Sequence, residues 1–346
     1  MRRNLVLVTG ASGFVGKWTV IELLRAGYSV RGAFRSAERA ESVKQAVIAQ
    51  LGDEVLYRLS FVKLDLMLDN GWAKAMLKVD AIVHTAAKVV TREPKDPGKV
   101  VGPAVEGTER VLRFATRAGV RRIVMTSSVV TIGYGHGPRR GPHIFSETDN
   151  TELDGIGFPW AYCVAKTKAE RVAWAYARNE GLELTTIHPG AVLGPALDGY
   201  VSPSLRLVSG LLNGSTPALA HCGFSIIDVR DVAALHVAAL NHDAAIGERY
   251  LAASDYVSFS QIAQMLAASY PAQNVTRKKV PDWVIKLLAR FGGPSRLIAN
   301  DIGNEKHYTR DKGEALLGHP YRSADSAILA AAESLFALGL LERHSG

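Results

Sequence analysis

Two residues in the middle of the chain have the types and spacing that suit proton transfer. Tyr162 lies four residues before Lys166 in the segment PWAYCVAKTKAE. In a helix, residues four apart lie on one face about a turn apart, so a phenol and an ammonium can meet there. The spacing alone is common in helical proteins and leaves open an ordinary surface pair. Other motifs have to decide whether this is a proton donor and the cation that tunes it.

A glycine-rich turn follows the first apolar run of the chain. It reads VTGASGFVG and places Gly10, Gly13 and Gly16 at three-residue spacing. A turn from a strand into a helix needs close backbone approaches that side chains would block, and the helix N-terminus offers free N–H groups to a pyrophosphate. A plain tight turn is the alternative. The position between a strand and an amphipathic helix favours dinucleotide binding.

The end of the second expected strand bears on which dinucleotide binds. An NAD site would place an acid there for the adenosine ribose, whereas this chain reads VRGAFRS. Arg35 and Ser36 end the strand, and Arg39 follows. A guanidinium makes charge-assisted contacts with a 2'-phosphate, so NADP is predicted rather than NAD. Arg35 as a solvated charge stays an alternative, and Glu38 nearby counts mildly against phosphate binding.

Length and composition bound the class of protein. A chain of 346 residues with 47% hydrophobic content can bury a sizeable core. The net charge is +8, but the Lys and Arg residues are dispersed and the densest patch, at 138–142, is short, so no nucleic-acid partner is expected. A positive field instead suits a phosphorylated cofactor. Cys163 and Cys222 lie far apart with no ligands at metal spacing, which predicts reduced thiols, no metal site and a cytoplasmic setting.

The N-terminal segment MRRNLVLV has the charge pattern of a secretory signal. Its apolar run ends at Thr9 and Gly10, which is too short for the apolar core of such a signal. No stretch approaches the roughly 18 apolar residues that a membrane span needs. We therefore expect a soluble protein without a membrane contact.

Short apolar runs alternate with longer helical patterns through the first half of the chain. This alternation predicts an α/β fold, a doubly wound parallel sheet of the Rossmann type with helices on both faces. Strands are expected at residues 5–8, 29–34, 59–62, 81–84, 122–126 and 184–188, and helices at 14–25, 38–50, 104–118 and from 162 onward. Gly27 and Gly119 fall just past helical stretches, where a left-handed cap residue is expected.

The alternation weakens after Pro189. We predict a dinucleotide-binding domain over residues 1–189, with segments near 220–255 returning to it, and a smaller, mostly helical substrate lobe over residues 190–346. Helices are expected there at 229–240, 260–269 and 281–291. Within the last of these, Val284, Leu287, Leu288 and Phe291 form an apolar stripe that is predicted to be core, with a membrane or partner surface as the alternative.

Taken together, the motifs resemble the extended short-chain dehydrogenase/reductase family. They are TGASGFVG, GYSVRGAFR, VRRIVMTSSV, AYCVAKTKAE and TIHPGAVLGP, and the resemblance covers residues 4–240. It points to the branch of dihydroflavonol 4-reductase, cinnamoyl-CoA reductase and microbial aldehyde and ketone reductases. The resemblance implies an NADP-dependent oxidoreductase that reduces an aldehyde or ketone to an alcohol.

The same resemblance implies a catalytic triad. The serine of the family falls on Ser128, its tyrosine on Tyr162 and its lysine on Lys166. Tyr162 would donate the proton that the carbonyl oxygen needs after hydride transfer. Lys166 would lower the phenol pKa from about 10 and hold the nicotinamide ribose. Ser128 would hydrogen-bond the substrate oxygen, with Ser127 and Thr126 as neighbouring alternatives, since a shift of one residue reverses the face of the strand.

Further contacts are implied by the resemblance alone. Cofactor contacts fall on Phe14 and Val15 in the glycine loop, Asp65 and Leu66 near the adenine, Ala86, Ala87 and Lys88 after the fourth strand, and Pro189 and Val192 beside the nicotinamide. The substrate is expected near Val89, Val129 and Ala191. Asp65 as a helix cap stays open, and so does strand-end packing for HTAAK. His84 is predicted to be a buried structural histidine.

Other functions stay open beside the carbonyl reductase. A sugar-nucleotide epimerase or dehydratase shares the fold and triad but usually prefers NAD, so Arg35 counts against it. A hydroxysteroid-type dehydrogenase and a non-catalytic NADP sensor are further possibilities, although a sensor would commonly lose the tyrosine or lysine. The loop at 132–143 is unlike a flavonoid pocket, and Ala161 stands where cinnamoyl-CoA reductases have an aromatic residue. The expected partner is a small carbonyl compound, and the chain is expected to be a monomer or homodimer.

Overall fold

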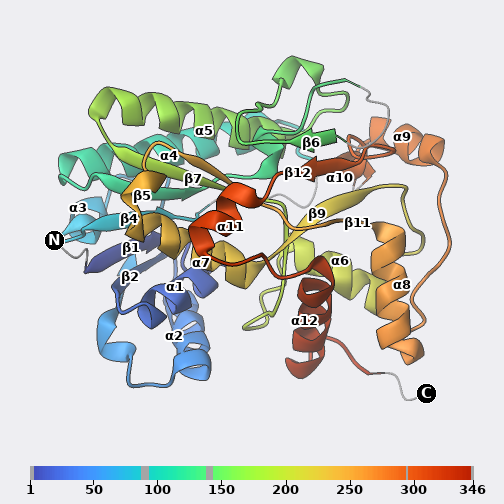
Figure 1. Ribbon diagram of the computed structural model, residues 1–346, viewed down its shortest axis with the longest axis horizontal. Coiled ribbons are helices and arrows are strands. Elements are labelled where there is room, and N and C mark those ends of the chain that lie inside the picture. The colour runs from blue at the N-terminus through green and yellow to red at the C-terminus, as the bar shows by residue number, and fades with distance from the viewer. Residues whose placement is uncertain (1–3, 87–92, 138–142, 294, 344–346) are drawn as a thin grey trace.

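The computed structural model describes residues 4–86, 93–137, 143–293 and 295–343. A seven-stranded parallel sheet forms its centre, in the order β10-β7-β5-β4-β1-β2-β3 (Figure 1). The strands are β1 (Leu5–Thr9), β2 (Ser29–Phe34), β3 (Leu59–Lys63), β4 (Ala81–His84), β5 (Arg122–Thr126), β7 (Glu183–Pro189) and β10 (Arg249–Ala252). The order reverses between β1 and β4, and the carboxyl ends of the strands around such a switch point commonly bind ligands. The predicted doubly wound sheet is confirmed.

Helices cover both faces of this sheet. One layer contains α1 (Phe14–Arg25), α2 (Ala37–Leu51) and α7 (Val229–Asn241), and the other contains α3 (Trp72–Met76), α4 (Gly98–Arg117) and α5 (Ala161–Glu180) (Figure 1). Because successive side chains of a strand point to opposite faces, Val6 and Val8 pack in the core with α1 and α7, whereas Leu7 packs in the core with α4 and α5. Each face of the sheet therefore has its own apolar core.

Local sequence signals predicted this half of the chain closely. The predicted bounds of α1, β2, β4 and β5 are those observed, and Gly27 and Gly119 have positive φ angles of 90° and 72°. The start of α4 was predicted too late, at residue 104. The helix begins at Gly98 and continues through Pro103. A proline lacks the N–H that an inner helical turn uses, so a helix that continues through Pro103 is not expected from local sequence.

The C-terminal part contains more strand than predicted. Its helices are α6 (Pro203–Leu212), α8 (Phe259–Ser269), α9 (Asp282–Arg290), α10 (Ser295–Ile298), α11 (Asp311–Leu317) and α12 (Ala324–Ala337). A second sheet, β11-β9-β8, joins β8 (Ala191–Leu193), β9 (Gly223–Asp228) and β11 (Tyr256–Ser258), and β6 (His143–Phe145) pairs with β12 (Lys306–Tyr308). β10 joins the main sheet, and the assignment of segments near 220–255 to the first domain stays a prediction. A domain boundary at residue 189 stays a prediction.

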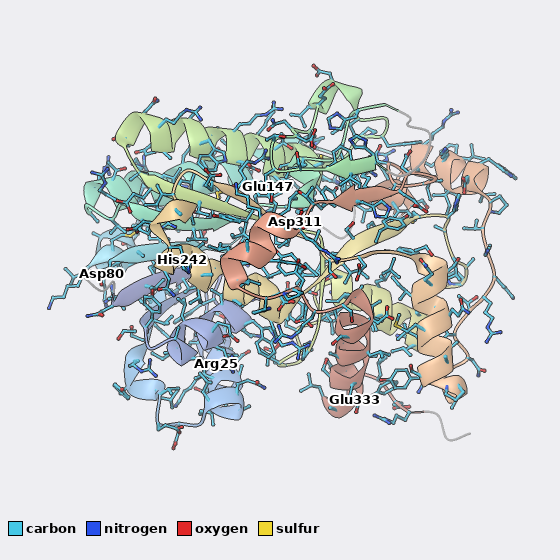
Figure 2. All side chains as sticks on the ribbon, viewed as in Figure 1. Arg25, Asp80, Glu147, His242, Asp311 and Glu333 are labelled. Atoms are coloured by element: carbon cyan, nitrogen blue, oxygen red, sulfur yellow. The ribbon has the colours of Figure 1, made fainter. Side chains whose placement is uncertain are left out.

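Glu147 connects β10 to the segment after β12. Its carboxylate accepts hydrogen bonds from the N–H of Leu251, at 3.2 Å, and from the hydroxyl of Thr309, at 3.1 Å. Asp311 at the start of α11 lies close to this junction in the side-chain view (Figure 2). Hydrogen bonds of this kind join the C-terminal elements to the edge of the main sheet.

The prediction that the apolar stripe of α9 is core was wrong. Leu287, Leu288 and Phe291 are 44%, 49% and 84% exposed, and the helix buries Ile285 and Ala289 instead. Helical periodicity groups side chains on one face but does not determine whether another element covers that face. Among the helices of the described residues, none combines the length and apolar character that a membrane crossing needs.

Candidate active site

The glycine loop forms a tight cradle between β1 and α1. Gly10 has φ +71°, and a Cβ on it would lie 2.7 Å from the backbone of Ala86 after β4. A Cβ on Gly16 would overlap the carbonyl oxygen of Gly10, and one on Gly13 would lie 3.3 Å from the same oxygen. Side chains at Gly10 and Gly16 would therefore collide with backbone, and the first-turn N–H groups of α1 lack partners in a preceding turn. This cradle fits a pyrophosphate.

The positions of Phe14 and Val15 at the start of α1 indicate how these two residues would contact the cofactor. The side chain of Phe14 is buried and that of Val15 packs partly against the same core. Their contribution to an anion at the cradle would therefore come from backbone N–H groups. This is the usual way in which a helix N-terminus holds a phosphate.

The arginines predicted for a 2'-phosphate lie at the surface near this cradle. Arg35 follows β2 directly and Arg39 lies in the first turn of α2, and both are exposed. Neither guanidinium forms a hydrogen bond or ion pair within the part of the chain that the structure describes. Ser36 occupies the N-cap position of α2, and its hydroxyl holds the pKa of Glu38 below the usual value. Glu38 therefore has Ser36 as its partner, and both guanidinium groups are left for an anion.

The other predicted cofactor contacts fall at the same edge of the sheet or outside the described residues. Asp65, just after β3, accepts a hydrogen bond from the Met67 N–H at 2.8 Å, which is a local turn. Leu66 lies against Gly107 of α4, Pro189 ends β7, and Ala191 and Val192 belong to β8. Ala87, Lys88 and Val89 lie outside the described residues. His84 is buried and bonds the Thr9 hydroxyl at 2.6 Å, as predicted for a structural histidine.

The three hydroxyls at the end of β5 and just after it have different partners. The Thr126 hydroxyl bonds His236 at 2.7 Å, and the Ser127 hydroxyl donates to Glu170 at 2.5 Å. The Ser128 hydroxyl accepts from the Val130 N–H at 3.3 Å, and it is the one of the three that lies near the Tyr162 phenol and opposes the rise of its pKa. Of the neighbouring alternatives, the structure therefore brings Ser128 to the tyrosine.

Tyr162 and Lys166 lie one turn apart on α5, but their side chains have different partners. The Lys166 ammonium donates to the Thr126 carbonyl oxygen at 2.9 Å. Burial lowers the pKa of Lys166 to about 8, and the charge of Glu170 opposes that shift. Burial raises the pKa of Tyr162 above its usual value, and the hydrogen bond from Ser128 opposes this only in part.

The expected lowering of the phenol pKa by Lys166 is therefore not what the structure shows. The ammonium is held by a backbone carbonyl, and desolvation of the phenol dominates instead. A raised pKa keeps Tyr162 protonated at neutral pH, which is the state that a proton donor needs. Val129, expected near the substrate, is buried in an apolar cluster with Ile132 and Phe145.

A buried polar network behind the triad was missed. Glu170 bonds Ser127, accepts from Arg249 Nε at 3.1 Å, and lies 3.5 Å from His188 Nε2. His188 Nδ1 in turn lies 3.3 Å from the Ser128 carbonyl oxygen. The sequence contained one usable signal, because Glu170 follows Lys166 by one further turn. The sequence contained no signal for the pairing of Glu170 with Arg249, which lies 79 positions later.

A second missed residue fixes the start of α5. Glu93 Oε1 accepts a hydrogen bond from the Ala161 N–H at 2.8 Å, next to Tyr162. The two residues are 68 positions apart, so no local pattern could reveal the contact. Trp160 supplies the aromatic ring next to Ala161, with its centroid 6.3 Å from that of Tyr162.

Comparison with known proteins gives consistent matches. Residues 6–253 match the model of the NAD dependent epimerase/dehydratase family. The chain is 34% identical to dihydroflavonol 4-reductase of Zea mays over 80% of this chain and 77% of that protein. It is 29% identical to cinnamoyl-CoA reductase CAD2 of Medicago truncatula over 81% and 85% of the two chains.

A solved structure shares the fold over nearly the whole chain. It is the yeast methylglyoxal/isovaleraldehyde reductase complexed with NADPH, with a TM-score of 0.76 and 23% identity. The match covers 97% of this chain and 100% of that one. At this level of identity the likeness establishes the common fold.

Proposed function

We propose that this chain, an NADP-dependent oxidoreductase, reduces an aldehyde or ketone to an alcohol. It belongs to the NAD dependent epimerase/dehydratase family, the extended short-chain dehydrogenases/reductases, and the proposal proceeds from this membership. The predicted family resemblance is thus confirmed. The observation that carries the proposal is the position of the Ser128 hydroxyl near the Tyr162 phenol at the carboxyl edge of the sheet, with Lys166 one turn further along α5. The relatives named as reductases of a dihydroflavonol and a cinnamoyl-CoA support a carbonyl substrate.

The proposed chemistry assigns one role to each side chain. NADPH, when bound, supplies the hydride that goes to the carbonyl carbon. Ser128 donates a hydrogen bond to the carbonyl oxygen and orients it, and Tyr162 donates the proton that this oxygen takes up. Lys166, one turn further along α5, would hold the nicotinamide ribose of the bound cofactor. Proton and hydride together convert the C=O group to the alcohol.

The cofactor would be held by groups at both ends of the cradle. Gly10, Gly13 and Gly16 leave room for the pyrophosphate, and the N-terminus of α1 faces it. Arg35 and Arg39 would take the 2'-phosphate by charge-assisted hydrogen bonds. The yeast reductase with the same fold was solved with NADPH, which supports this choice.

The principal test is a screen of aliphatic and aromatic aldehydes and ketones, followed by the loss of NADPH absorbance. We expect Tyr162→Phe to lower kcat by about 10²- to 10⁴-fold while NADPH still binds, because the ring is kept and the proton is lost. An unchanged rate in this variant would contradict the proposed proton donor. Turnover of a nucleotide sugar without net loss of cofactor would instead favour an epimerase or dehydratase.

A second test addresses the choice of dinucleotide. Arg35→Ala should raise the KM for NADPH by about tenfold or more, since a charge-assisted contact to the 2'-phosphate is lost. The KM for NADH should change little, because NADH has no phosphate there. Equal effects on both cofactors would show that Arg35 does not read the phosphate.

A further inference from the structure

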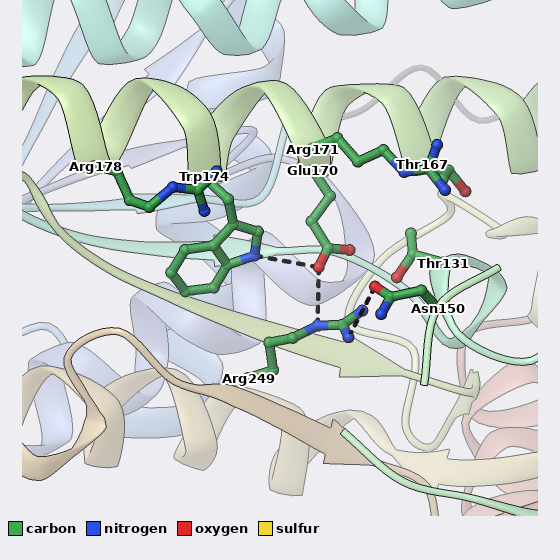
Figure 3. A pocket seen from close by; sticks show the side chains of 8 residues that line it. All are labelled: Thr131, Asn150, Thr167, Glu170, Arg171, Trp174, Arg178 and Arg249. Carbon is green, nitrogen blue, oxygen red and sulfur yellow. Dashed lines mark hydrogen bonds and ion pairs between the residues drawn. The ribbon is translucent and has the colours of Figure 1, made fainter. Parts of the chain in front are cut away.

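A pocket of about 250 Å³ lies beside Glu170 of α5 (Figure 3). One face of α5 contributes Arg171, Trp174 and Arg178, and Arg249 approaches from β10. Ser128, Tyr162, Lys166 and the glycine loop are not among the residues that line it. The pocket is therefore separate from the crevice proposed for NADPH and the carbonyl substrate.

The lining of this pocket carries a surplus of positive charge. It holds three guanidinium groups and a single carboxylate, that of Glu170. The oxygens of Glu170 are already occupied by Arg249 at 3.1 Å, the Trp174 indole N–H at 3.3 Å and Ser127 at 2.5 Å. Arg249 thus balances Glu170, and the charges of Arg171 and Arg178 have no acidic counterpart in the lining.

These two arginines are available for a ligand. Arg171 donates one hydrogen bond, to the Thr151 carbonyl oxygen at 2.9 Å. Arg178 forms neither an ion pair nor a hydrogen bond with any residue that the structure describes. Both are exposed, so their guanidinium groups can reorient over the pocket. A planar guanidinium matches the geometry of carboxylate and phosphate oxygens.

Two other groups complete the lining. The indole ring of Trp174 offers a flat apolar wall (Figure 3). The Thr167 hydroxyl is buried and has no hydrogen-bond partner within the described chain beyond a weak contact with the Cys163 thiol. Buried hydroxyls are nearly always satisfied, so an open one in the wall of a pocket marks a place where a bound polar group would gain a contact.

We propose that this pocket binds a small organic carboxylate or phosphate. Its oxyanion pairs with Arg171 and Arg178, and its apolar part lies against Trp174. The volume suits a molecule of a few non-hydrogen atoms and excludes a dinucleotide.

Two residues that line the pocket also form hydrogen bonds to Ser127 and to the backbone of Ser128. Glu170 accepts from Ser127, and the Thr131 hydroxyl, also in the lining, donates to the Ser128 carbonyl oxygen at 2.9 Å. An anion bound here consequently changes the position of Ser128 and with it the turnover number. This consequence depends on the proposed function, whereas the binding itself does not.

Isothermal titration calorimetry tests the binding directly. The full chain is titrated at constant ionic strength with benzoate, with inorganic phosphate and with uncharged benzyl alcohol. Each titration is made with and without saturating NADP⁺, so that anion binding at the dinucleotide cradle is recognised. We expect benzoate or phosphate to bind in both conditions and benzyl alcohol not to bind. Binding that NADP⁺ abolishes would assign the anion to the cradle and overturn the proposal.

Matched variants on α5 locate the site. Arg178→Gln should weaken anion binding by about tenfold or more, because a charge-assisted hydrogen bond is lost. Lys168→Gln removes an equally exposed cation of the same helix outside the pocket and should leave the affinity unchanged. Equal affinities in the two variants would refute the site. Arg178 is exposed and forms no ion pair or hydrogen bond with the described residues, so a folding defect in this variant is not expected.

The turnover of the proposed reductase tests the coupling. Benzoate at a concentration near its Kd for the unaltered chain should change kcat of the unaltered chain and change kcat of Arg178→Gln much less. Binding without any change in kcat would overturn the coupling to Ser128 alone. Absence of reductase activity would count against the proposed function and leave the calorimetric result on the pocket valid.

Discussion

Two buried charged side chains lie one turn apart on α5, and their surroundings compensate the two charges to different degrees. Lys166 has one hydrogen bond, to the Thr126 carbonyl oxygen, and burial lowers its pKa to about 8. Glu170 is bonded by Ser127, Arg249 and Trp174. Burial raises the pKa of Glu170, but the neighbouring positive groups and hydrogen bonds together hold it below its usual value. One charge is poorly compensated and the other is well compensated.

This difference separates a reacting group from a supporting one. A buried charge with few partners titrates near working pH, and such groups concentrate at active sites. A buried charge with a full set of partners stays in one state and fixes the geometry around it. We therefore expect that removing Lys166 mainly lowers activity, and that removing Glu170 mainly lowers the unfolding free energy.

The largest effect is expected for Lys166→Met on activity. The variant loses the buried cation that would hold the nicotinamide ribose one turn from the proposed proton donor, so kcat/KM for carbonyl reduction should fall by about 10²- to 10⁴-fold. NADPH oxidation with a substrate found in the screen measures this. Lys168→Met, an exposed cation two residues further on, is the control and should retain the original rate. A similar loss in both variants would remove the distinction between the two lysines.

Glu170→Gln should have the next largest effect, on stability. The change leaves the Arg249 guanidinium partly buried without its carboxylate, and breaking a buried pair in this way costs roughly 2–4 kcal/mol of unfolding free energy. Urea unfolding followed by circular dichroism measures the loss. An unfolding free energy equal to that of the unaltered chain would show that Glu170 is not a supporting charge.

Lys166→Met should shift stability in the other direction. In the folded chain the pKa of Lys166 is about 8 against 10.5 in the unfolded chain, so the unfolded state binds more protons between these values. The unfolding free energy of the cofactor-free protein should therefore rise as pH increases from about 8 to 10.5. Below pH 8 the full cost of burying the charged ammonium is present. At pH 7 the unfolding free energy of the variant should be higher by about 1–3 kcal/mol, and it should no longer increase between pH 8 and 10.5. A less stable variant at pH 7 would contradict the poor compensation of Lys166.

The smallest effect is expected for Trp174→Phe. This change removes one hydrogen bond to Glu170, of 3.3 Å, while the bonds from Arg249 and Ser127 remain. The unfolding free energy should fall by less than about 1 kcal/mol. A loss as large as that of Glu170→Gln would show that the partners of Glu170 are not redundant. Thermal or urea unfolding beside the unaltered chain decides this.

The degree to which the structure could be predicted differs along the chain. β2, β4 and β5 have apolar runs bounded by turn residues, and their bounds were predicted from the sequence. β8 and β11 have three residues each, too few to show a period, and they exist only because β9 lies between them. The stripe of α9 had the right period for a buried face, yet the side chains of Leu288 and Phe291 are exposed.

The sequence by itself determined the relations that lie within one turn or one loop. It placed Tyr162 and Lys166 on one face of a helix and the three glycines in one strand-to-helix turn, because helical and turn geometry depends on near neighbours. Tertiary structure alone decided that Arg249 compensates Glu170, and it places Ser128, the serine that the family resemblance implied, near Tyr162. Desolvation and charge pairing depend on every group within a few ångströms, and the fold brings those groups together from distant parts of the chain.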